Sequence, residues 1–284
     1  MSKVVYISDF FLNDVVGGGE LNDNELILLL REEGYEILKI KSDNVSSDFL
    51  RNNLDCFYIV SNFIFLKEKC KTMLKNKHNY IIYEHDHKYL KTRNPLNYEN
   101  FKAPPEEIIN SKFYLGAKAV FCQSSFHMKI IEKNLNLKNL INVSGNLWSL
   151  DTLEYIEALS KCKKNDKISI LNSPVPHKNT ADTEFYCKYK KYDYEKISSS
   201  NYRLFLELLS KNKKFIFLPK TPETLSRIIV EAKMLNVEVI TNKNIGACYE
   251  PWYSLNGVEL IEEMRRCRDK ITSLVAKTIE EKND

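Results

Sequence analysis

Residues 215–240, FIFLPKTPETLSRIIVEAKMLNVEVI, carry the pattern from which the fold can be inferred. The stretch opens with an apolar run at 215–218 and closes with a second at 237–240. Between the two runs, residues 222–235 repeat apolar side chains at helical spacing. Thr221 suits an N-cap, and Pro222 suits the first position of a helix. We therefore predict a strand, a helix that begins at Thr221, and a second strand.

The same alternation extends along the chain. Apolar runs rich in β-branched and aromatic residues lie at 4–7, 36–40, 56–60, 80–83, 119–122, 140–143, 168–171 and 192–197. Helical patterns cover 20–33, 66–76, 105–114, 124–135, 151–160, 199–210 and 258–281. Near-continuous apolarity is typical of strands buried on both faces, so the alternation predicts an α/β protein with parallel sheets.

The elements fall into two series that separate near residues 144–149. We expect a Rossmann-like N-terminal domain over 1–146, a second Rossmann-like domain over 147–257, and a C-terminal helical segment over 258–284. Two such halves suggest a ligand held in the cleft between the carboxyl ends of both sheets.

Composition narrows the class of protein. The 284 residues are 43% hydrophobic and 28% charged, which is too apolar for a disordered chain. The sequence has no run of about 18 apolar residues, so no transmembrane segment is predicted. The first residues are interpreted as a strand and not as a signal peptide. Seven cysteines without a C-x-x-C pair argue against a disulfide framework or a cysteine zinc site, so a cytoplasmic protein is expected.

A glycine-rich loop, Gly17-Gly18-Gly19-Glu20, leads directly into a predicted helix. Glycines before a helix let backbone N–H groups approach a phosphate or a sugar closely. The dinucleotide pattern G-x-G-x-x-G is not met, because Asn22 occupies its last position. The alternative is a flexible turn in which Glu20 favours the helix dipole.

Another loop, Glu84-His85-Asp86-His87-Lys88, follows a predicted strand. Its spacing is unlike a known metal motif, so a bound metal is disfavoured. We interpret it as a loop whose histidine hydrogen-bonds a sugar or holds a proton, with histidines that only cap the loop as the alternative.

Two loops of the second domain carry charge. Lys178 precedes a helical stretch, where a cation and helix N–H groups could share a diphosphate. Glu223 falls in the first turn of the helix predicted from Thr221, and Glu231 follows eight residues later, about 12 Å along the axis. That distance suits a donor sugar and its ribose. The alternatives are a solvated lysine and two ordinary helix glutamates.

Together these loops resemble retaining GT-B glycosyltransferases of the family-4 type. The E-x7-E pair of Glu223 and Glu231 matches that family's helix, and Gly17–Gly19 with Glu20 resembles its N-terminal loop. His85-Asp86 resembles its histidine loop, and the Ser124-Ser125-Phe126 turn resembles the one before its linker. The resemblance implies two Rossmann-like domains that face each other across a cleft, with the C-terminal helix packed back on the N-terminal domain.

The resemblance also implies the reaction and the roles of residues. A sugar passes from a nucleoside diphosphate to an acceptor with retention at the anomeric carbon, without a bound metal or other cofactor. Lys178, Glu223 and His85 are the implied catalytic residues. The implied donor-binding residues are Gly18, Gly19, Lys178, Glu223, Thr224, Leu225, Arg227 and Glu231. UDP-sugars are favoured over GDP-sugars.

One departure from the family leaves alternatives open. Ser173 stands where the family has an arginine, so Lys178, Lys220, Arg227 or backbone groups would have to neutralise the diphosphate. The missing arginine keeps a non-catalytic nucleotide-sugar-binding protein as one alternative. A UDP-sugar 2-epimerase-like enzyme, which shares this architecture and in which His85 and Asp86 could serve as acid/base groups, is the other. The acceptor is open among a glycan, a lipid-linked saccharide and a small molecule, and the aromatic and basic stretch 185–192 keeps nucleic acid as a minor option.

Overall fold

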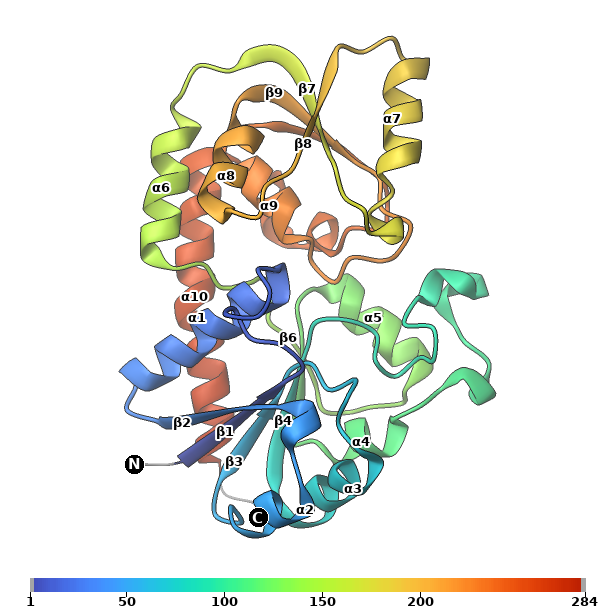
Figure 1. The fold of residues 1–284 in the computed structure, drawn as a ribbon, viewed down its shortest axis with the longest axis vertical. Helices are drawn as coiled ribbons and strands as arrows, with labels where there is room; N and C mark the ends of the chain where they lie inside the picture. Colours follow the sequence, from blue (N-terminus) through green and yellow to red (C-terminus); the bar gives the residue numbers. More distant parts are fainter. Residues whose placement is uncertain (1–2, 282–284) are drawn as a thin grey trace. The chain divides into compact units, whose positions relative to one another are not determined.

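A computed structural model describes residues 3–281 and contains two parallel β-sheets flanked by helices (Figure 1). The chain divides into two compact units. The first comprises the chain up to Leu147 together with the chain from Cys267 onward, and the second runs from Trp148 to Arg266. The predicted α/β class with parallel sheets is confirmed. Residues 1–2, at the start of the predicted N-terminal domain, and residues 282–284, at the end of the predicted C-terminal segment, lie outside the described residues.

The first unit holds a six-stranded sheet in the order β2-β1-β3-β4-β5-β6. Its strands are β1 (Lys3–Ser8), β2 (Glu36–Lys41), β3 (Phe57–Val60), β4 (Asn79–Glu84), β5 (Ala119–Cys122) and β6 (Leu140–Asn142). β3 and β5 are buried along their whole length. This is the reason that their sequences are continuously apolar instead of alternating.

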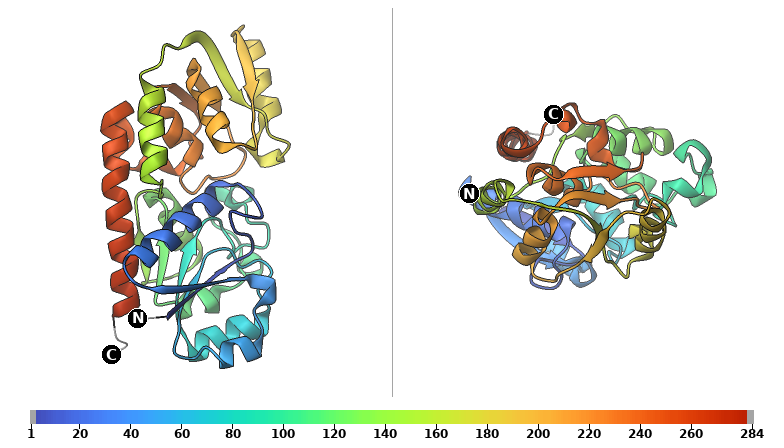
Figure 2. Two further views of the ribbon diagram at one scale, coloured as in Figure 1. Left: turned by 60° about the vertical axis from the view of Figure 1, so that its left-hand side comes forward. Right: turned by 90° about the horizontal axis from the view of Figure 1, so that it is seen from above.

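Helices cover both faces of this sheet. They are α1 (Gly18–Glu32), α2 (Ser47–Arg51), α3 (Glu68–Lys77), α4 (Ser111–Gly116), α5 (Ser125–Asn134) and the C-terminal part of α10 (Gly257–Glu280). Right-handed crossovers place α1 on one face and α3, α4 and α5 on the other. The end of α10 lies on the α1 face (Figure 2). There Arg268 donates to Glu25 (2.8 Å) and Tyr35 donates to Glu280 (2.8 Å).

The second unit holds a four-stranded parallel sheet in the order β10-β9-β7-β8. Its strands are β7 (Asn165–Leu171), β8 (Tyr194–Ile197), β9 (Asn212–Phe217) and β10 (Glu238–Thr241). Its helices are α6 (Leu150–Ser160), α7 (Thr180–Tyr189), α8 (Tyr202–Ser210), α9 (Arg227–Met234) and the first part of α10. α7 covers one face of the sheet, and α8 and α9 cover the other (Figure 1).

Every predicted strand is present, to within a few residues at its ends. Short 3-10 turns complete the chain at Ser42–Asn44, Pro95–Asn97, Glu99–Phe101, Pro105–Glu107, Pro176–Lys178, Gly246–Tyr249 and Pro251–Ser254. The helix predicted over 105–114 is wrong in its first half. Only the 3-10 turn at Pro105–Glu107 forms there, and Ile108 is extended and bridged to Leu90. Asn110, with a left-handed φ of 57°, then precedes α4 at Ser111.

The helix predicted to begin at Thr221 is also wrong in its first turn, because α9 begins at Arg227. Glu223 instead forms a parallel bridge with Ile245. The N–H of Glu223 donates to the carbonyl of Asn244 (2.7 Å), and its carbonyl accepts from the N–H of Gly246 (2.9 Å). The carbonyl of Glu223 is thus bonded to Gly246 and not to the N–H of residue 227, as a helix begun at Thr221 would require. Glu223 therefore lies in a loop, and its predicted spacing from Glu231 along a helix does not apply.

Two histidines are buried in the core of the first unit. The rings of His87 and His127 are 5.1 Å apart and perpendicular. Nδ1 of His127 accepts from the N–H of Gln123 (3.3 Å), and its Nε2 donates to the carbonyl of Asp86 (3.1 Å). Burial lowers the pKa of His87 to about 3 and holds the pKa of His127 well below its ordinary value. Both rings are therefore neutral in the folded protein.

We expect this burial to make the protein sensitive to acid. The unfolded histidines titrate near 6.5, so between pH 6.5 and the folded pKa of about 3 for His87 the unfolded state binds more protons. The stabilisation is complete above pH 6.5 and is lost as the pH falls. Each histidine contributes a slope of up to about 1.4 kcal/mol per pH unit. Urea unfolding of the wild type and of His87→Gln across this range measures the difference.

The matched control is His177→Gln, because His177 is exposed. We expect the control to leave the pH dependence of the free energy of unfolding unchanged, whereas His87→Gln flattens it by up to one proton's contribution. Equal slopes in His87→Gln and the wild type would contradict the argument.

Candidate functional site

The candidate groups gather at the carboxyl edge of each sheet. In the first sheet the strand order reverses between β1 and β3, and in the second between β7 and β9. Such reversal points are where loops diverge and where ligands bind in open α/β sheets. The glycine loop follows β1, the loop of Lys178 follows β7, and the loop of Glu223 follows β9.

Asp23, which sequence reasoning did not single out, is the polar centre of the first unit. It lies on α1, is 1% exposed, and accepts hydrogen bonds from several buried groups. Its Oδ1 lies 2.8 Å from the hydroxyl of Tyr6 and 2.6 Å from Nε2 of His85, and its Oδ2 accepts from Ser61. Burial next to this carboxylate raises the pKa of Tyr6 well above its usual value, so the phenol stays a donor.

The same contacts fix the orientation and tautomer of His85. The amide nitrogen of Gln123 lies 2.8 Å from Oδ1 of Asn146 and 2.7 Å from Nδ1 of His85. Because that amide donates, Nδ1 accepts, and the ring proton sits on Nε2 and points to Asp23. The side chain of His85 is 6% exposed. A sugar hydroxyl that bonds to Nδ1 would therefore take the place of the Gln123 amide.

The glycine loop comes close to this histidine. A Cβ built on Gly19 would lie 3.6 Å from Cγ of His85, so the start of α1 packs against the imidazole ring. Gly18 is exposed, and Glu20 lies in the first turn of the helix. Partial burial raises the pKa of Glu20. The structure thus brings Gly19 and His85 together, as the candidate site requires.

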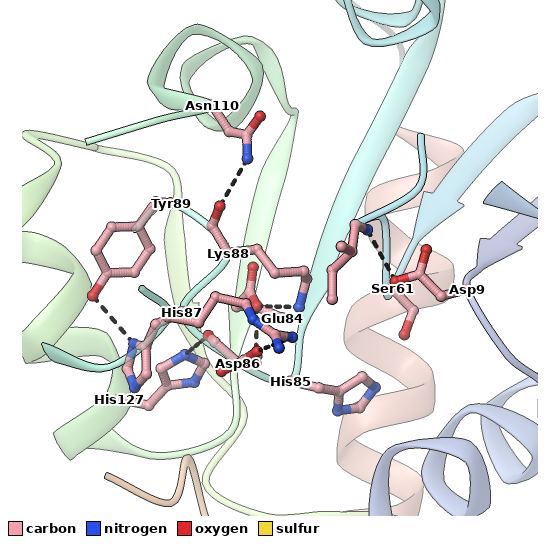
Figure 3. Close-up of polar contacts among 12 residues, drawn as sticks. Asp9, Ser61, Glu84, His85, Asp86, His87, Lys88, Tyr89, Asn110 and His127 are labelled. Atoms are coloured by element: carbon pink, nitrogen blue, oxygen red, sulfur yellow. Dashed lines mark hydrogen bonds and ion pairs between the residues drawn. The ribbon is translucent and has the colours of Figure 1, made fainter. Parts of the chain in front are cut away.

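The rest of the histidine loop is held by separate contacts (Figure 3). Lys88 reaches back to the buried carboxylate of Glu84 (2.5 Å), and Asp86 pairs with Arg93 (3.1 Å). His87 lies against Tyr89, whose hydroxyl is 3.1 Å from its Nδ1. Within residues 3–281, no group of three or more histidine, cysteine and acidic side chains could hold a metal ion.

In the second unit, Lys178 and Glu223 form an ion pair. Nζ of Lys178 lies 2.9 and 3.1 Å from the two carboxylate oxygens of Glu223. The lysine side chain is 30% exposed and the glutamate side chain 14% exposed. Two residues 45 positions apart thus meet at the edge where β7 and β9 end. The structure brings together two of the three predicted catalytic residues.

The loop that carries Glu223 is held by backbone bonds. After Thr224, the carbonyl of Leu225 accepts from the N–H of Ala247 (3.0 Å). Leu225 itself is fully buried. Ser173, at the position where the resemblance expects arginine, donates its N–H to the hydroxyl of Thr180 (3.0 Å) and so closes the loop of Lys178. Lys220 forms an exposed pair with Asp182 (2.8 Å).

Ser226, directly before α9, is an unusual residue that the sequence did not reveal. Its φ of 73° lies in the left-handed region that favours glycine. The residue is 5% exposed, and within the described part of the chain its hydroxyl has no hydrogen-bond partner. A strained backbone and an unsatisfied buried hydroxyl at a helix N-terminus are features of a site for a negatively charged ligand.

Further along α9, the buried carboxylate of Glu231 organises a cluster of donors. Its Oε1 accepts from Nε of Arg227 (2.9 Å), Nε1 of Trp148 (3.0 Å) and the hydroxyl of Tyr202 (2.5 Å). The Arg227 guanidinium lies over the Trp148 ring, 4.3 Å from its centroid. Burial raises the pKa of Tyr202 above its usual range. The ribose contact predicted for Glu231 stays a prediction, but the placement of Arg227 by Glu231 is now evident.

Comparison with known proteins gives no match to a protein-family model and none to a curated protein. Solved structures do match. The catalytic domain of starch synthase IV from Arabidopsis thaliana, bound to ADP and acarbose, has a TM-score of 0.57 at 11% identity and covers 99% of this chain and 96% of its own. Anabaena HepE in complex with UDP and glucose has a TM-score of 0.53 at 12% identity and covers 98% and 92%.

A third similar structure is an alpha-glucosyltransferase in complex with UDP and a 13-mer DNA that contains an HMU base. Its TM-score is 0.51 at 11% identity, and it covers 97% of this chain and 95% of its own. These structures are GT-B glycosyltransferases. The likeness establishes the fold, and the chain has the α/β fold with two parallel sheets that they share.

Proposed function

We propose that this protein is a glycosyltransferase that moves a sugar from a nucleoside diphosphate, with UDP favoured, to an acceptor hydroxyl with retention at the anomeric carbon. The observation that carries the proposal is the ion pair of Lys178 and Glu223 at the reversal point of the second sheet, in a chain with the GT-B fold. Lysine next to a carboxylate is poised to exchange that partner for a diphosphate.

The second unit would bind the donor. When the donor arrives, Lys178 turns from Glu223 to the diphosphate and stabilises the charge that grows on it as the anomeric C–O bond breaks. Glu223 is then free to accept hydrogen bonds from sugar hydroxyls. The hydroxyl of Ser226, the guanidinium of Arg227 and the N–H groups that open α9 add donors for the phosphates.

The first unit would contribute His85. Its Nδ1 accepts from a sugar hydroxyl after the Gln123 amide gives way, while Asp23 keeps the proton on Nε2. A carboxylate bonded to the Nε2–H makes Nδ1 a stronger acceptor. Gly18 and Gly19 present backbone N–H groups beside the ring. We propose that no bound metal takes part, so activity should persist with a chelator present.

Two alternatives are separated by their products. A UDP-sugar 2-epimerase-like enzyme converts its substrate without an acceptor, and a non-catalytic nucleotide-sugar-binding protein gives neither transfer nor hydrolysis. The acceptor is open among a glycan, a lipid-linked saccharide and a small molecule. Nucleic acid is the minor candidate. It is favoured by the exposed aromatic side chains of Phe185 and Tyr189 on α7 and by the DNA bound in one similar structure.

The first prediction concerns the donor pair. UDP should raise the melting temperature by mass action, more than GDP or ADP does. Lys178→Ala should weaken UDP binding about tenfold and lower transfer or donor hydrolysis about 10²–10³-fold, and Glu223→Ala should lower turnover about 10²-fold with less effect on UDP. Thermal shift, calorimetry and product analysis of UDP-sugar incubations measure these effects.

The control for the donor pair is Lys213→Ala, which removes a lysine paired with Asp166 (3.3 Å) at an exposed site of the same unit. It should leave UDP binding unchanged. A protein that no nucleotide stabilises, or an epimer formed without an acceptor, would refute the proposed transferase.

The second prediction concerns Asp23. In Asp23→Asn the side chain loses its charge, and its amide no longer enforces the proton on Nε2 of His85, so transfer should fall about 10²-fold and its pH profile should move. UDP affinity should stay within about twofold. The matched control is Asp9→Asn. Asp9 is also buried, but its carboxylate accepts from the backbone of Ile64 (2.9 Å) and Phe65 (3.2 Å) and not from His85. If both variants shift the pH profile alike, Asp23 does not act through His85.

The third prediction concerns Ser226. Ser226→Ala removes an unsatisfied buried hydroxyl, so the free energy of unfolding should hold or rise, while the Kd for UDP should rise roughly three- to tenfold. Ser226→Gly should also stabilise the fold, because glycine accepts the φ of 73° without strain. Equal UDP affinity in Ser226→Ala and the wild type would remove this residue from the donor site.

A further inference from the structure

A hollow in the first unit contains none of the residues assigned to the donor. Its volume is about 530 Å³, within the range of small-molecule sites. Phe63 and Ile64, in the loop after β3, form one side, and Lys88 and Lys91, in the loop after β4, form another. Both loops leave the sheet at its carboxyl edge, and the loop after β4 is the histidine loop itself, in which Figure 3 shows Lys88.

The lining of this hollow is strongly basic. Lys71, Lys88, Lys91 and Arg93 face it, against the single carboxylate of Glu68. The most buried pair of ammonium groups belongs to Lys71 and Lys88, whose side chains are 9% and 2% exposed. Ammonium groups held in apolar surroundings attract an anion more strongly than solvated ones do. The hollow is therefore suited to a compact anion.

The lysines around the hollow differ in how easily an incoming anion could replace their carboxylate partners. The charge of Lys88 is neutralised by Glu84, which is fully buried and also accepts a hydrogen bond from the hydroxyl of Tyr114. Lys71 instead pairs with Glu68, whose side chain is 82% exposed, and donates to Oδ1 of Asn110 (2.9 Å). Because Glu68 is the solvated member of this pair, an anion can replace it on Lys71 without leaving a buried carboxylate unpaired.

The rim adds two cations with equally weak partners. Lys91 lies 3.8 Å from Glu107, and Arg93 lies 3.1 Å from Asp86, with side chains 53% and 50% exposed. Arg93 has a left-handed φ of 53°, a backbone conformation that costs a non-glycine residue about 1 kcal/mol and that sets the direction of its side chain. Lys71, Lys91 and Arg93 thus line the same hollow, each paired with a carboxylate.

The walls of the hollow are partly apolar. The ammonium groups of Lys71 and Lys88 lie 5.6 and 5.5 Å from the centroid of the Phe63 ring. An antiparallel bridge between Leu90 and Ile108 ties the loop after β4 to the segment before α4. Ile64, 48% exposed, supplies apolar surface at the edge of the hollow. A ligand with a charged group and a neutral body matches both parts.

We propose that this hollow binds a phosphate or diphosphate group carried by the acceptor. The inference rests on the proposed function, because the acceptor is the second substrate of that transfer. Arg93 recognises phosphate oxygens through its planar fork, and Lys71 and Lys91 supply point charges. The phosphate anchors the acceptor in the first unit, and the body attached to it carries the hydroxyl that receives the sugar.

The test is a titration of the full-length protein saturated with UDP, so that the donor site is already occupied. The probes are inorganic phosphate, glucose 1-phosphate and farnesyl phosphate, with farnesol as the uncharged comparison. We expect at least one phosphate ester to bind and farnesol not to. Tighter binding of farnesyl phosphate identifies a lipid-linked acceptor, and tighter binding of glucose 1-phosphate identifies a sugar phosphate. Both results support the proposal.

Variants locate the binding. Lys71→Gln should raise the Kd of the bound ester about tenfold or more, and Arg93→Gln several-fold, by loss of charge-assisted hydrogen bonds. Lys69→Gln is the matched control, since Lys69 is exposed on the same helix and does not line the hollow. Urea unfolding confirms that each variant is folded.

Two outcomes overturn the proposal, namely no phosphate ester binding to the UDP-saturated protein, or equal affinities in Lys71→Gln and Lys69→Gln. Failure of the proposed function has a different signature, because UDP would then not stabilise the protein at all.

Discussion

The parallel arrangement of strands is the constraint on which the rest of this structure depends. Parallel strands need crossover helices, so every strand leaves its sheet at the same edge and every functional loop starts there. Gly19, His85 and Asp23 meet at that edge of the first sheet, and Lys178 and Glu223 meet at that edge of the second. Residues far apart in sequence become neighbours because the sheet has one carboxyl edge and not because of any local signal.

This arrangement buries charged groups, and the protein compensates each of them differently. A buried carboxylate is costly unless donors surround it. Asp23 and Glu231 are each encircled by hydroxyl, ring N–H or guanidinium donors, and Glu84 by an ammonium and a hydroxyl. Removing one donor would leave a charge partly unpaired, so these clusters hold their geometry. They are suited to orienting other side chains, as Glu231 orients Arg227.

The strands could be predicted from sequence because burial on both faces leaves a continuous apolar run, as in Phe57–Val60. The start of α9 could not be predicted from sequence. Thr221 and Pro222 carry good local signals for a helix start, yet the backbone of Glu223 pairs with residues 244–246, a contact that no local pattern encodes. Tertiary pairing therefore outweighed capping preference.

The candidate site was predictable to a similar extent. Lys178 and His85 could be named because polar and charged residues in loops after strands are conspicuous. Glu223 could be named from its spacing to Glu231, although the helix that this spacing assumed does not include it. Asp23 and Ser226 could not, because a polar residue within a helical pattern and a serine before a helix are both ordinary in sequence. Their significance comes from the fold, which leaves Asp23 only 1% exposed and Ser226 only 5% exposed and which gives Ser226 a left-handed φ.

Glu231 in α9 and Glu223 in the loop before α9 differ in how firmly their partners hold them, and the reason is again burial. Glu231 is buried among three donors, and breaking that cluster would remove the carboxylate that accepts from Nε of Arg227. The partner of Glu223 is a lysine that is 30% exposed, so an anion that enters from solvent can reach that lysine. A diphosphate carries more charge than one carboxylate, so it can displace Glu223 from Lys178 but has no comparable advantage over Glu231. Under the proposed function, the first pair is the one that exchanges on donor binding, and the second is the fixed frame against which it does so.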